Sequence, residues 1–542
     1  MNYYNLGTHS RPVSTSSVGA QTWFDRGLVW LYGYNHVAAI DCFERAIEAD
    51  PACAMAHWGV AQSVGPNYNK PWETFEPAEK EKSLAKGRAA IAAAMSANGA
   101  SAAERALIEA VGHRYPETTV EDIAPWNDAF AEAMRGVYRA FPGDLDIAAL
   151  FAEAMMNRTP WKLWDLPTGQ PADGADTIEA MEVLERALGQ DGAWEHPGLL
   201  HFYIHLMEMS PHPERALRHG DRLSTLVPDA GHLLHMGTHI DVLCGDYHSV
   251  MDRNMRAIEA DRRWLEREGP DNFYSVYRCH NYHFRIYGAM FLGQPTAALE
   301  TADELASKLP EHVLRPMADW FEAFVPMKQH VFIRFGMWTE ILAQPLPADA
   351  GLYAMTTALM RYARTVALAN LGDLAAAEAE RDAFLAAQAA VPESRMLFNN
   401  TCEDILKIAE QMMLGEMEYH KGNVEAAFEH LRRAVHFDDT LPYDEPWGWM
   451  QPARHALGAL LLEQGRLDEA EAVYRADLGL DATLARACQH PQNVWSLHGL
   501  HECLTRRGEE VEAHHVKLQL DRAAARAEVP IRASCYCRRK AA

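Results

Sequence analysis

A unit of about 34 residues, built from two helices that pack against each other, recurs along this chain and limits its possible folds. The clearest copy covers residues 23–51 and carries packing residues where two antiparallel helices must interlock: Trp23, Gly27, Ala39, Phe43, Ala46 and Pro51. The segment AIEAD occurs at residues 46–50 and again at 257–261, which sets the register of a second copy. Stacking such units buries one continuous core, so the chain need not divide into separate domains.

Turn glycines mark further copies, because each ends one helix before a new amphipathic helix begins. They are Gly372, Gly422, Gly465 and Gly508. No segment shows the period-two alternation and β-branched enrichment typical of strands, so we expect no sheet. The packing residues lie at the spacing of a tetratricopeptide (TPR) unit. The sequence therefore predicts an all-α fold, a right-handed TPR-like α-solenoid in which helix hairpins form a superhelix.

The domain prediction has three parts. A polar N-terminal segment covers residues 1–20, a continuous solenoid covers 21–525, and a C-terminal tail covers 526–542. Inserts rich in Trp, Pro and Gly interrupt the solenoid at residues 65–77, 156–176, 331–351 and 441–452. We expect these inserts to be irregular, and either to fold into the groove of the solenoid or to cap one of its ends.

Charge and composition exclude several classes of protein. The formal net charge is −25, and we find no basic stripe of the kind that nucleic-acid binding requires. No apolar run reaches the ~18 residues of a transmembrane helix, and residues 1–19 lack the pattern of an export signal. The nine cysteines form no spaced framework. A reduced, cytoplasmic location is therefore expected, with neither nucleic acid nor membrane as a partner.

Cys535 and Cys537, in the tail sequence IRASCYCRRK, are an exception among the cysteines. Arginines flank the pair, and neighbouring cations favour the thiolate form of cysteine. This motif predicts a redox or metal-binding tail, and the alternative is a frayed tail with two idle thiols.

Histidine is concentrated in one part of the chain, since 11 of the 26 histidines lie between His196 and His283. In each unit, positions 2, 5, 9 and 12 of the first helix share one face, which lines the concave side of the solenoid. Three successive units carry histidine there: His201, His205 and Glu208, then His232, His235 and His239, then His280, His283 and Tyr287. Position 5 across nine registered units reads Phe24, Trp58, His201, His235, His283, Tyr362, Met412, His455 and His498.

This stripe has the spacing of a metal site. Adjacent helix axes lie about 8–10 Å apart, so imidazoles from neighbouring helices can meet at one ion with bonds of ~2.0–2.1 Å. His pairs at i and i+4 present two ligands on one face. The predicted ligands are His201, His205, Glu208, His235, His239, His280 and His283, for a divalent transition metal (Fe, Cu, Zn or Mn). The alternative is that these histidines are hydrogen-bonded lining residues.

Aromatic and polar residues elsewhere on the predicted inner face suggest a small-molecule pocket. The candidate substrate-binding residues are Trp58, Asn67, Asn69, Trp72, Glu445, Trp449, His455, Trp495 and His498. Tyr287 is the candidate catalytic proton donor. The alternative is that the tryptophans fill gaps in the core between irregular repeats.

Longer segments resemble a group of large bacterial TPR proteins, among them GHLLHMGTHI and DEPWGWMQPARHALGALLLEQG. The pattern H-x-x-x-H-x-x-E-M at residues 201–209 and the pair His280 and His283 look, more distantly, like the tetratricopeptide repeat protein 38 family. The resemblance implies an all-α TPR fold and draws attention to the same histidines, but it implies no activity.

Three functions remain open at this point. The first is a metal-dependent enzyme of the oxidoreductase type, acting on a small molecule held inside the solenoid. The second is a TPR scaffold that binds a protein or peptide partner in its concave groove without catalysis. The third is a metal-sequestering or sensing protein. The sequence does not predict the oligomeric state.

Overall fold

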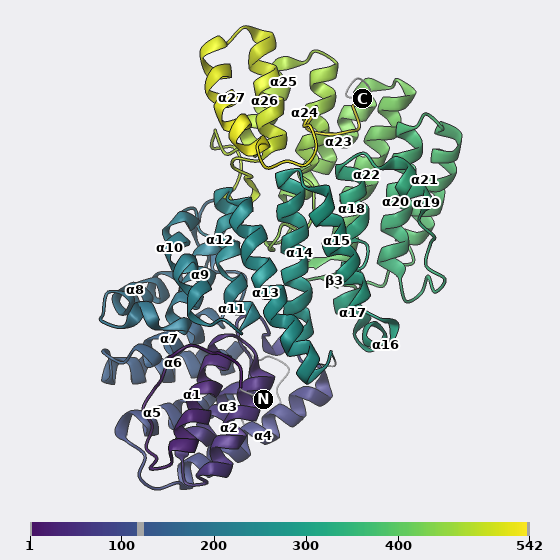
Figure 1. Cartoon of the computed structure of the whole chain (residues 1–542). Helices are drawn as coiled ribbons and strands as arrows, with labels where there is room; N and C mark the ends of the chain where they lie inside the picture. Colours follow the sequence, from purple (N-terminus) through teal and green to yellow (C-terminus); the bar gives the residue numbers. More distant parts are fainter. Residues whose placement is uncertain (1–2, 116–123, 271, 539–542) are drawn as a thin grey trace. The chain divides into compact units, whose positions relative to one another are not determined.

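The computed structural model describes residues 3–115, 124–270 and 272–538. The chain divides into two compact units, one formed by Met1–Ile240 with Glu259–Tyr274 and the other by Asp241–Ile258 with Ser275–Ala542. Each unit is built almost entirely from helices joined by short turns (Figure 1). The chain is thus an all-α, TPR-like solenoid, as predicted. A single continuous solenoid over residues 21–525 stays a prediction.

The first unit contains a run of helices in which neighbours along the chain pack against each other. They are α1 (Val18–Tyr32), α2 (His36–Ala49), α3 (Ala54–Ser63), α4 (Pro77–Ser96), α5 (Ala102–Val111), α6 (Ala124–Ala140), α7 (Leu145–Met156), α8 (Thr177–Leu188), α9 (Pro197–Glu208), α10 (Leu217–Leu226) and α11 (Gly231–His235). Short 3₁₀ turns lie between them: η1 (Trp72–Thr74), η2 (Gly112–Arg114), η3 (Ala193–Glu195) and η4 (Pro213–Ala216). Helices α12 (Gly237–Cys244) and α13 (Tyr247–Glu268) each contribute residues to both units.

The second unit continues the same pattern. Its helices are α14 (Tyr274–Leu292), α15 (Pro295–Ser307), α16 (Glu311–Leu314), α17 (Ala318–Phe321), α18 (Met327–Arg334), α19 (Trp338–Ala343), α20 (Ala354–Asn370), α21 (Leu374–Gln388), α22 (Cys402–Lys421), α23 (Val424–Asp439), α24 (Ala453–Glu463), α25 (Leu467–Asp477), α26 (Val494–Arg507) and α27 (Glu510–Ala524). Its 3₁₀ turns are η5 (Arg315–Met317), η6 (Glu322–Phe324) and η7 (Arg486–Cys488).

The same packing contact recurs in both units: a large side chain packs against a glycine that lies sixteen residues earlier in the chain. The ring of Phe43 in α2 lies so close to Gly27 of α1 that a Cβ added to this glycine would be 2.7 Å from the ring. A Cβ added to Gly59 of α3 would be even closer to the same ring. Tyr474 of α25 lies in the same way against Gly458 of α24. The absent side chains let three helices approach closely, which is the geometry that a TPR hairpin requires.

The turn glycines end their helices as the sequence predicts. Gly422 and Gly508 have φ values of 90° and 78° at the C-terminal ends of α22 and α26, in the left-handed region that favours glycine. Gly372 and Gly465 also have positive φ values, of 86° and 74°.

Two expectations about irregular and extended structure need correction. The insert at residues 331–351 is partly helical, because α18 ends within it and α19 lies inside it. Among the residues that the structure describes, the expectation of no sheet holds apart from two hairpins with two-residue strands. They pair β1 (Trp164–Asp165) with β2 (Gln170–Pro171) and β3 (Met396–Leu397) with β4 (Asn400–Thr401).

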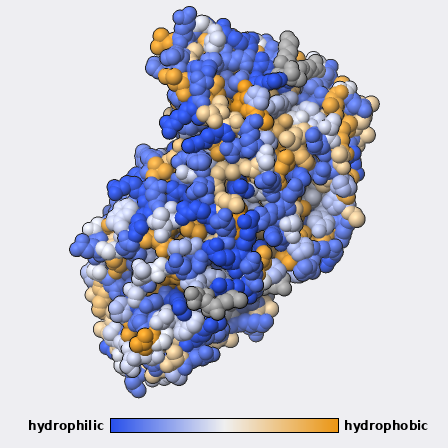
Figure 2. Space-filling view, in the orientation of Figure 1, coloured by the Kyte–Doolittle hydropathy of each residue, from blue (hydrophilic) through white to orange (hydrophobic). Residues whose placement is uncertain are grey.

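The residues predicted to line the inner face are mostly buried. Of the nine residues at position 5, all but His498 are buried. The face of the molecule drawn in Figure 2 is mostly hydrophilic, with apolar residues scattered among the polar ones.

We predict that Gly59→Ala destabilises the first unit by about 1–3 kcal/mol, because the new methyl group would collide with the Phe43 ring and force repacking. The control is Gly136→Ala in α6, where nothing lies within 4 Å of a new Cβ. It should be neutral or stabilising by up to about 1 kcal/mol, since alanine favours helix. Urea unfolding followed by circular dichroism measures both changes, and equal effects would contradict the glycine contact.

Candidate metal centre in the first unit

Helix α9 places two histidines on one buried face. It begins at Pro197 after His196, whose Nδ1 accepts a hydrogen bond of 3.2 Å from the Leu199 backbone and caps the helix. All twelve residues of α9 are buried. The i, i+4 spacing puts His201 and His205 one turn apart, with their ring centres 4.8 Å from each other.

Helices α11 and α12 bring three further histidines to this place. Together with residues of α9 they form what we call the histidine cluster, which consists of His201, His205, His232, His235, His239 and the carboxylate of Glu208. Each of these side chains is less than 2% exposed. The ring centre of His232 lies 5.0 Å from that of His201, and the ring centre of His239 lies 5.6 Å from that of His205. Five residues of the cluster were predicted as ligands, and the structure brings these five close together: His201, His205, Glu208, His235 and His239.

Hydrogen bonds at the Nδ1 atoms fix the tautomers of three rings. His201 Nδ1 lies 2.6 Å from the carbonyl oxygen of Tyr32. His205 Nδ1 and His239 Nδ1 lie 2.9 and 2.7 Å from the two oxygens of Glu208. Carbonyl and carboxylate oxygens only accept, so each Nδ1 must carry the proton. The Nε2 atom of each neutral ring is then left with a lone pair.

Two of these lone pairs meet no hydrogen-bond donor. Within the described residues, Nε2 of His201 and Nε2 of His205 are buried and have no hydrogen-bond partner. Nε2 of His239 lies 2.7 Å from Nε2 of His235, and His235 Nδ1 lies 3.2 Å from the Thr238 hydroxyl. His235 thus donates from Nε2 and accepts at Nδ1. A buried acceptor without a donor is costly, unless it serves another ligand.

The donor set fits a metal ion. His201, His205 and His232 each have one ring nitrogen that lies within 4.8 Å of the other two. Small side-chain movements would bring all three nitrogens to ~2.1 Å from one ion, which is the length of a nitrogen–metal bond. Metal-bound histidines usually donate their other N–H to a carboxylate or carbonyl, which orients the ring. Tyr32 and Glu208 provide those acceptors. The oxygens of Glu208 accept hydrogen bonds from His205 and His239, and its predicted role as a ligand stays a prediction.

Burial keeps the imidazoles in the form that binds metal. It lowers the pKa of His201 and of His239 to about 3, and the pKa of His205 well below its ordinary value. Taking a charged imidazolium out of water is unfavourable, so the neutral ring dominates near pH 7. A metal ligand must be neutral imidazole, so no proton has to be displaced from Nε2 on binding.

Aromatic side chains from two predicted inserts close the cluster. Tyr68 of the insert 65–77 and Trp161 of the insert 156–176 lie with ring centres 5.0 and 5.7 Å from that of His205. The hairpin in the second insert is tied to α9, since Trp164 Nε1 donates to the carbonyl of Leu206 over 2.7 Å. Both inserts therefore contribute a ring that packs against His205, and their expected place in the groove or at an end of the solenoid stays a prediction.

Sequence reasoning missed several members of this site. His232 lies at position 2 of the histidine stripe, so the repeat register could have included it among the ligands. Tyr34, whose ring centre is 4.6 Å from that of His201, sits in a turn with φ of 54°, and no local pattern points to it. Tyr68 and Trp161 are brought in only by the path of the inserts.

The other predicted ligands and the predicted catalytic residue belong to the second unit, on α14. His280 packs with its ring centre 4.6 Å from that of Phe398, and His283 Nε2 lies 2.8 Å from the Met450 sulfur. The ring centre of Tyr287 lies 4.6 Å from that of Phe291, and burial raises the pKa of its phenol well above 10. A catalytic role for Tyr287 stays a prediction.

The predicted substrate-binding residues of the first unit are mostly part of its packing. Asn67 Oδ1 accepts from the amides of Asn69 and Lys70 at 3.0 and 2.9 Å, which stabilises a turn. Trp72 packs at 4.8 Å on Phe75, and Trp58 is buried in α3.

Those of the second unit are likewise held by neighbours. Their contacts are Glu445 with the Tyr443 hydroxyl, Trp449 with His330, His455 with Arg334 and Asp477, and Trp495 with the carbonyl of Met290. His498 is half-buried. Substrate binding by these residues stays a prediction.

The tail cysteines are not frayed. Cys535 and Cys537 are both buried, and a disulfide joins them.

Comparisons with known proteins add little to this picture. No protein-family model matches the chain, and no curated protein matches it. The chain is similar to solved structures of helical-repeat proteins. One is of Naa15/Naa10 bound to HypK-THB, with 14% identity, coverage of 93% of this chain and 70% of that one, and a TM-score of 0.22.

Two further structures are of the same kind. The APC/C hetero-tetramer Cut9–Hcn1 has 12% identity, coverage of 93% and 87%, and a TM-score of 0.31. The P58(IPK) TPR domain has 11% identity, coverage of 91% and 99%, and a TM-score of 0.24. Likeness at this level carries no information about what this chain binds. Its relation to bacterial TPR proteins or to the tetratricopeptide repeat protein 38 family stays a prediction.

Within the described residues, no helix is both long and apolar enough to cross a membrane.

We predict that His201, His205 and His239 carry their proton on Nδ1 in the metal-free protein, because each Nδ1 faces a carbonyl or carboxylate oxygen. His235 should carry its proton on Nε2, because this atom faces the lone pair of His239 Nε2. Long-range ¹H–¹⁵N correlation spectra of protein labelled on histidine nitrogens distinguish the two tautomers. In Glu208→Gln the signals of His205 and His239 should change while those of His201 stay. Protonation of His201 on Nε2 would contradict the bond to Tyr32.

Proposed function

We propose that this protein is a TPR-like scaffold that binds a protein or peptide partner, and that its first unit is stabilised by a transition-metal ion held in the histidine cluster. The observation that carries the metal site is the pair of buried Nε2 atoms, on His201 and His205, that have no hydrogen-bond partner within the described residues. Catalysis is not part of the proposal.

The closed surroundings of the cluster favour a structural ion over a catalytic one. Structural zinc sites are enclosed by protein ligands, whereas catalytic sites keep one position open to water or substrate. Every side chain of the histidine cluster is less than 2% exposed, and Tyr68 and Trp161 pack against His205. A substrate would have to displace these rings before it reached the ion.

The ligand chemistry narrows the choice of metal. Imidazole suits zinc, copper, iron and nickel, whereas magnesium and calcium prefer oxygen ligands. We propose zinc, because it takes four ligands without a geometric demand of its own. His201, His205 and His232 would supply three nitrogens, while Glu208 would hold the ring of His205 in place.

We predict about one zinc ion per chain in protein purified without an affinity tag and measured by inductively coupled plasma mass spectrometry. Zinc at a hundredfold excess over its Kd should stabilise the fold by about 2.7 kcal/mol and raise the Tm of the protein. The double variant His201→Ala/His205→Ala should lose the metal and the shift in Tm.

The matched control for this experiment is His212→Ala, which removes an exposed histidine of the same unit and should keep the metal. Glu208→Gln should lower zinc affinity by about 10- to 100-fold, as is usual for a group that orients a ligand. A metal-free protein whose Tm ignores added zinc, copper, iron and manganese would exclude the centre.

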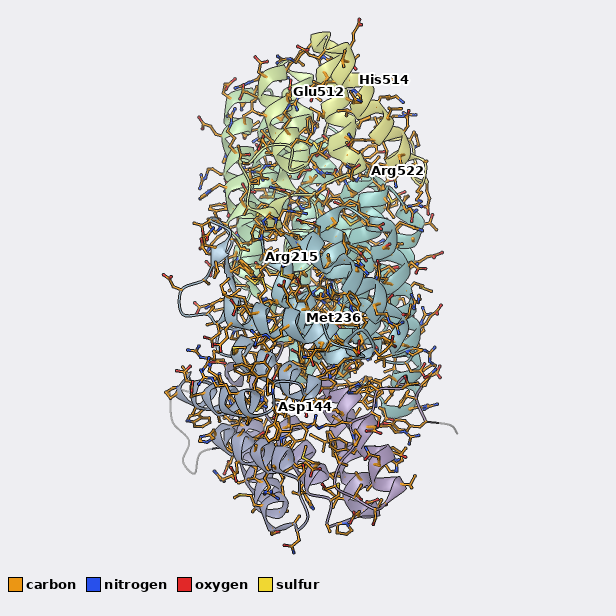
Figure 3. The ribbon with its side chains drawn as sticks, turned by 90° about the vertical axis from the view of Figure 1, so that its left-hand side faces the viewer. Asp144, Arg215, Met236, Glu512, His514 and Arg522 are labelled. Atoms are coloured by element: carbon orange, nitrogen blue, oxygen red, sulfur yellow. A yellow bond between two sulfur atoms is a disulfide. The ribbon has the colours of Figure 1, made fainter. Side chains whose placement is uncertain are left out.

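The scaffold function rests on the repeat architecture and on a surface of the second unit. Since the inner positions are closed, a partner has to bind elsewhere. The outer face of α27 exposes Leu518 at 57%, and Figure 3 shows Glu512, His514 and Arg522 along the same helix. Leu518, Arg522 and Arg526 are among the residues that line a cavity of about 670 Å³, whose lining also includes Asp246. An apolar contact beside two arginines suits an acidic amphipathic segment.

We predict that peptides selected on the purified protein from a display library are acidic and amphipathic. The variant Leu518→Asp/Arg522→Glu should weaken their binding by at least about tenfold, because it removes the apolar contact and reverses a charge. The control is Leu371→Asp, another exposed leucine of the second unit. Isothermal titration calorimetry measures the affinities, and equal binding by both variants would remove this surface from the proposal.

A further inference from the structure

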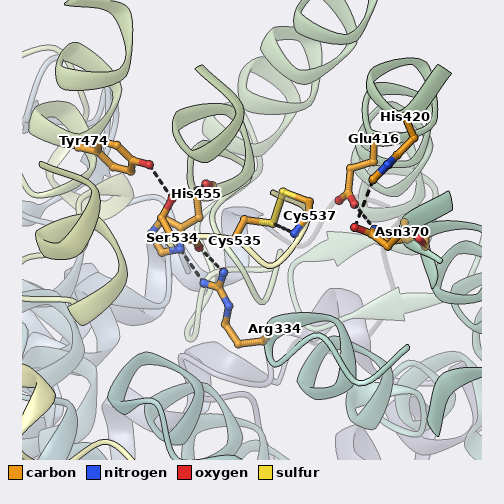
Figure 4. The surroundings of a disulfide bond; sticks show 10 residues. Arg334, Asn370, Glu416, His420, His455, Tyr474, Ser534, Cys535 and Cys537 are labelled. Carbon is orange, nitrogen blue, oxygen red and sulfur yellow. Dashed lines mark hydrogen bonds between the residues drawn. A yellow bond between two sulfur atoms is a disulfide. The ribbon is translucent and has the colours of Figure 1, made fainter. Parts of the chain in front are cut away.

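The C-terminal tail is fastened along the second unit. The backbone N–H of Glu528 donates to the carbonyl of Gly293 at 3.0 Å. Further on, the guanidinium of Arg334 donates to the carbonyl of Ser534, and the Ser534 hydroxyl donates to the carbonyl of His455 at 2.8 Å (Figure 4). These contacts hold the residues that follow Ser534 in one place.

That place contains the disulfide between Cys535 and Cys537. The two cysteines differ in exposure, at 7% for Cys535 and 1% for Cys537. The backbone N–H of Cys537 lies 3.2 Å from the sulfur of Cys535, a contact that would stabilise a thiolate on Cys535. Cys537 is the more deeply buried sulfur, so a thiolate formed there would need a proton.

Glu416 of α22 lies beside this pair. One of its carboxylate oxygens and the two sulfurs all lie within 4.8 Å of one another. Its known hydrogen-bond partner is the side-chain amide of Asn370, which donates over 3.0 Å and is also linked to the ring of His420 (Figure 4). The other titratable group facing it is Tyr362 of α20, whose pKa is raised well above 10 by burial and by Glu416 itself.

Burial raises the pKa of Glu416 to about 7. The carboxyl group therefore exists in both protonation states near neutral pH, which is the condition under which a group exchanges protons most effectively. No lysine or arginine is among the causes that shift this pKa, so burial prevails over the amide hydrogen bond from Asn370.

We propose that Cys535 and Cys537 form a redox couple that exchanges electrons with small thiols and disulfides, and that Glu416 transfers the proton to and from Cys537. This is a second site, in the second unit, and does not depend on the metal centre. Because both sulfurs are buried, the reaction partner is a low-molecular-weight thiol rather than a cysteine on a protein surface.

The reductive step balances as an ordinary thiol–disulfide exchange. The thiolate of the small thiol attacks the Cys535 sulfur, the bond between Cys535 and Cys537 breaks, and its electron pair remains on Cys537. Glu416 gives its proton to that sulfur. A second small thiolate then attacks the small-molecule sulfur of the mixed disulfide, and the Cys535 thiolate is the leaving group. Two small thiols are thus oxidised to one small disulfide for each protein disulfide reduced.

The oxidative direction runs through the same atoms. The thiolate of Cys535, next to the Cys537 N–H, attacks a small disulfide and releases one small thiolate. Glu416, now a carboxylate, removes the proton of Cys537, whose sulfur displaces the second small thiolate from Cys535. The rate of this closure should rise as pH increases through about 7, because the carboxylate form of Glu416 increases there.

The experiment uses the full chain, reduced with dithiothreitol, desalted, and mixed with oxidised glutathione between pH 5.5 and 9. Samples are quenched with acid, alkylated and cleaved with trypsin. The peptide of residues 533–538 contains both cysteines and no others, so its mass reports the fraction oxidised. The wild type should form the disulfide with an inflection near pH 7. Glu416→Gln should close at least about tenfold more slowly at pH 7 and accelerate only as the thiol itself ionises.

Two further variants make the result specific. Glu416→Asp should retain the inflection near neutral pH, and Glu410→Gln, on the same helix, should behave as the wild type. Thermal unfolding of each reduced variant checks that it is folded. The proposal is wrong if the pair remains reduced in oxidised glutathione, if Glu416→Gln keeps the wild-type pH profile, or if the reduced pair instead binds zinc stoichiometrically and thereby resists oxidation.

Discussion

The close approach of helices at glycine underlies the whole architecture. Phe43 packs against Gly27 and Gly59, and Tyr474 packs against Gly458 and Gly499, so that one ring is held between the helices before and after its own. A β-carbon at any of these glycines would separate the helices. The same spacing recurs at Gly415 and Leu431, which explains how hairpins of different sequence stack in one manner.

Close stacking also buries polar side chains, and two of the buried carboxylates each bind several of them. Asp146 accepts from His9, His196, Tyr32 and Arg11, and Asp477 accepts from His455, His490, Asn493 and Ser496. Each carboxylate meets enough donors to remain charged, and the pKa of each lies well below its ordinary value. Fully satisfied networks of this kind make the interior rigid.

The histidine cluster differs from these networks in one respect. Glu208 satisfies the Nδ1 atoms of His205 and His239, yet Nε2 of His201 and of His205 meet no donor within the described residues. The same molecule therefore contains histidines that serve as donors to a carboxylate and histidines that are oriented to offer lone pairs. That contrast separates the histidine cluster from the two carboxylate networks, and it is the observation on which the proposed metal site rests.

The sequence by itself determined the helical class, the positions of the turn glycines, and the stripe that carries His201, His205, His235 and His239. These features are local, because they follow from helical periodicity and from residues that only a tight turn or a close contact accepts. Only the tertiary structure decided that His232 joins the cluster and that Glu208 orients two of its rings. It also decided that Tyr68 and Trp161 pack over the site. In the second unit, it placed Glu416 beside Cys535 and Cys537. Those relations join residues far apart in the chain, and no periodic pattern encodes them, because they depend on the paths of inserts and tail through space.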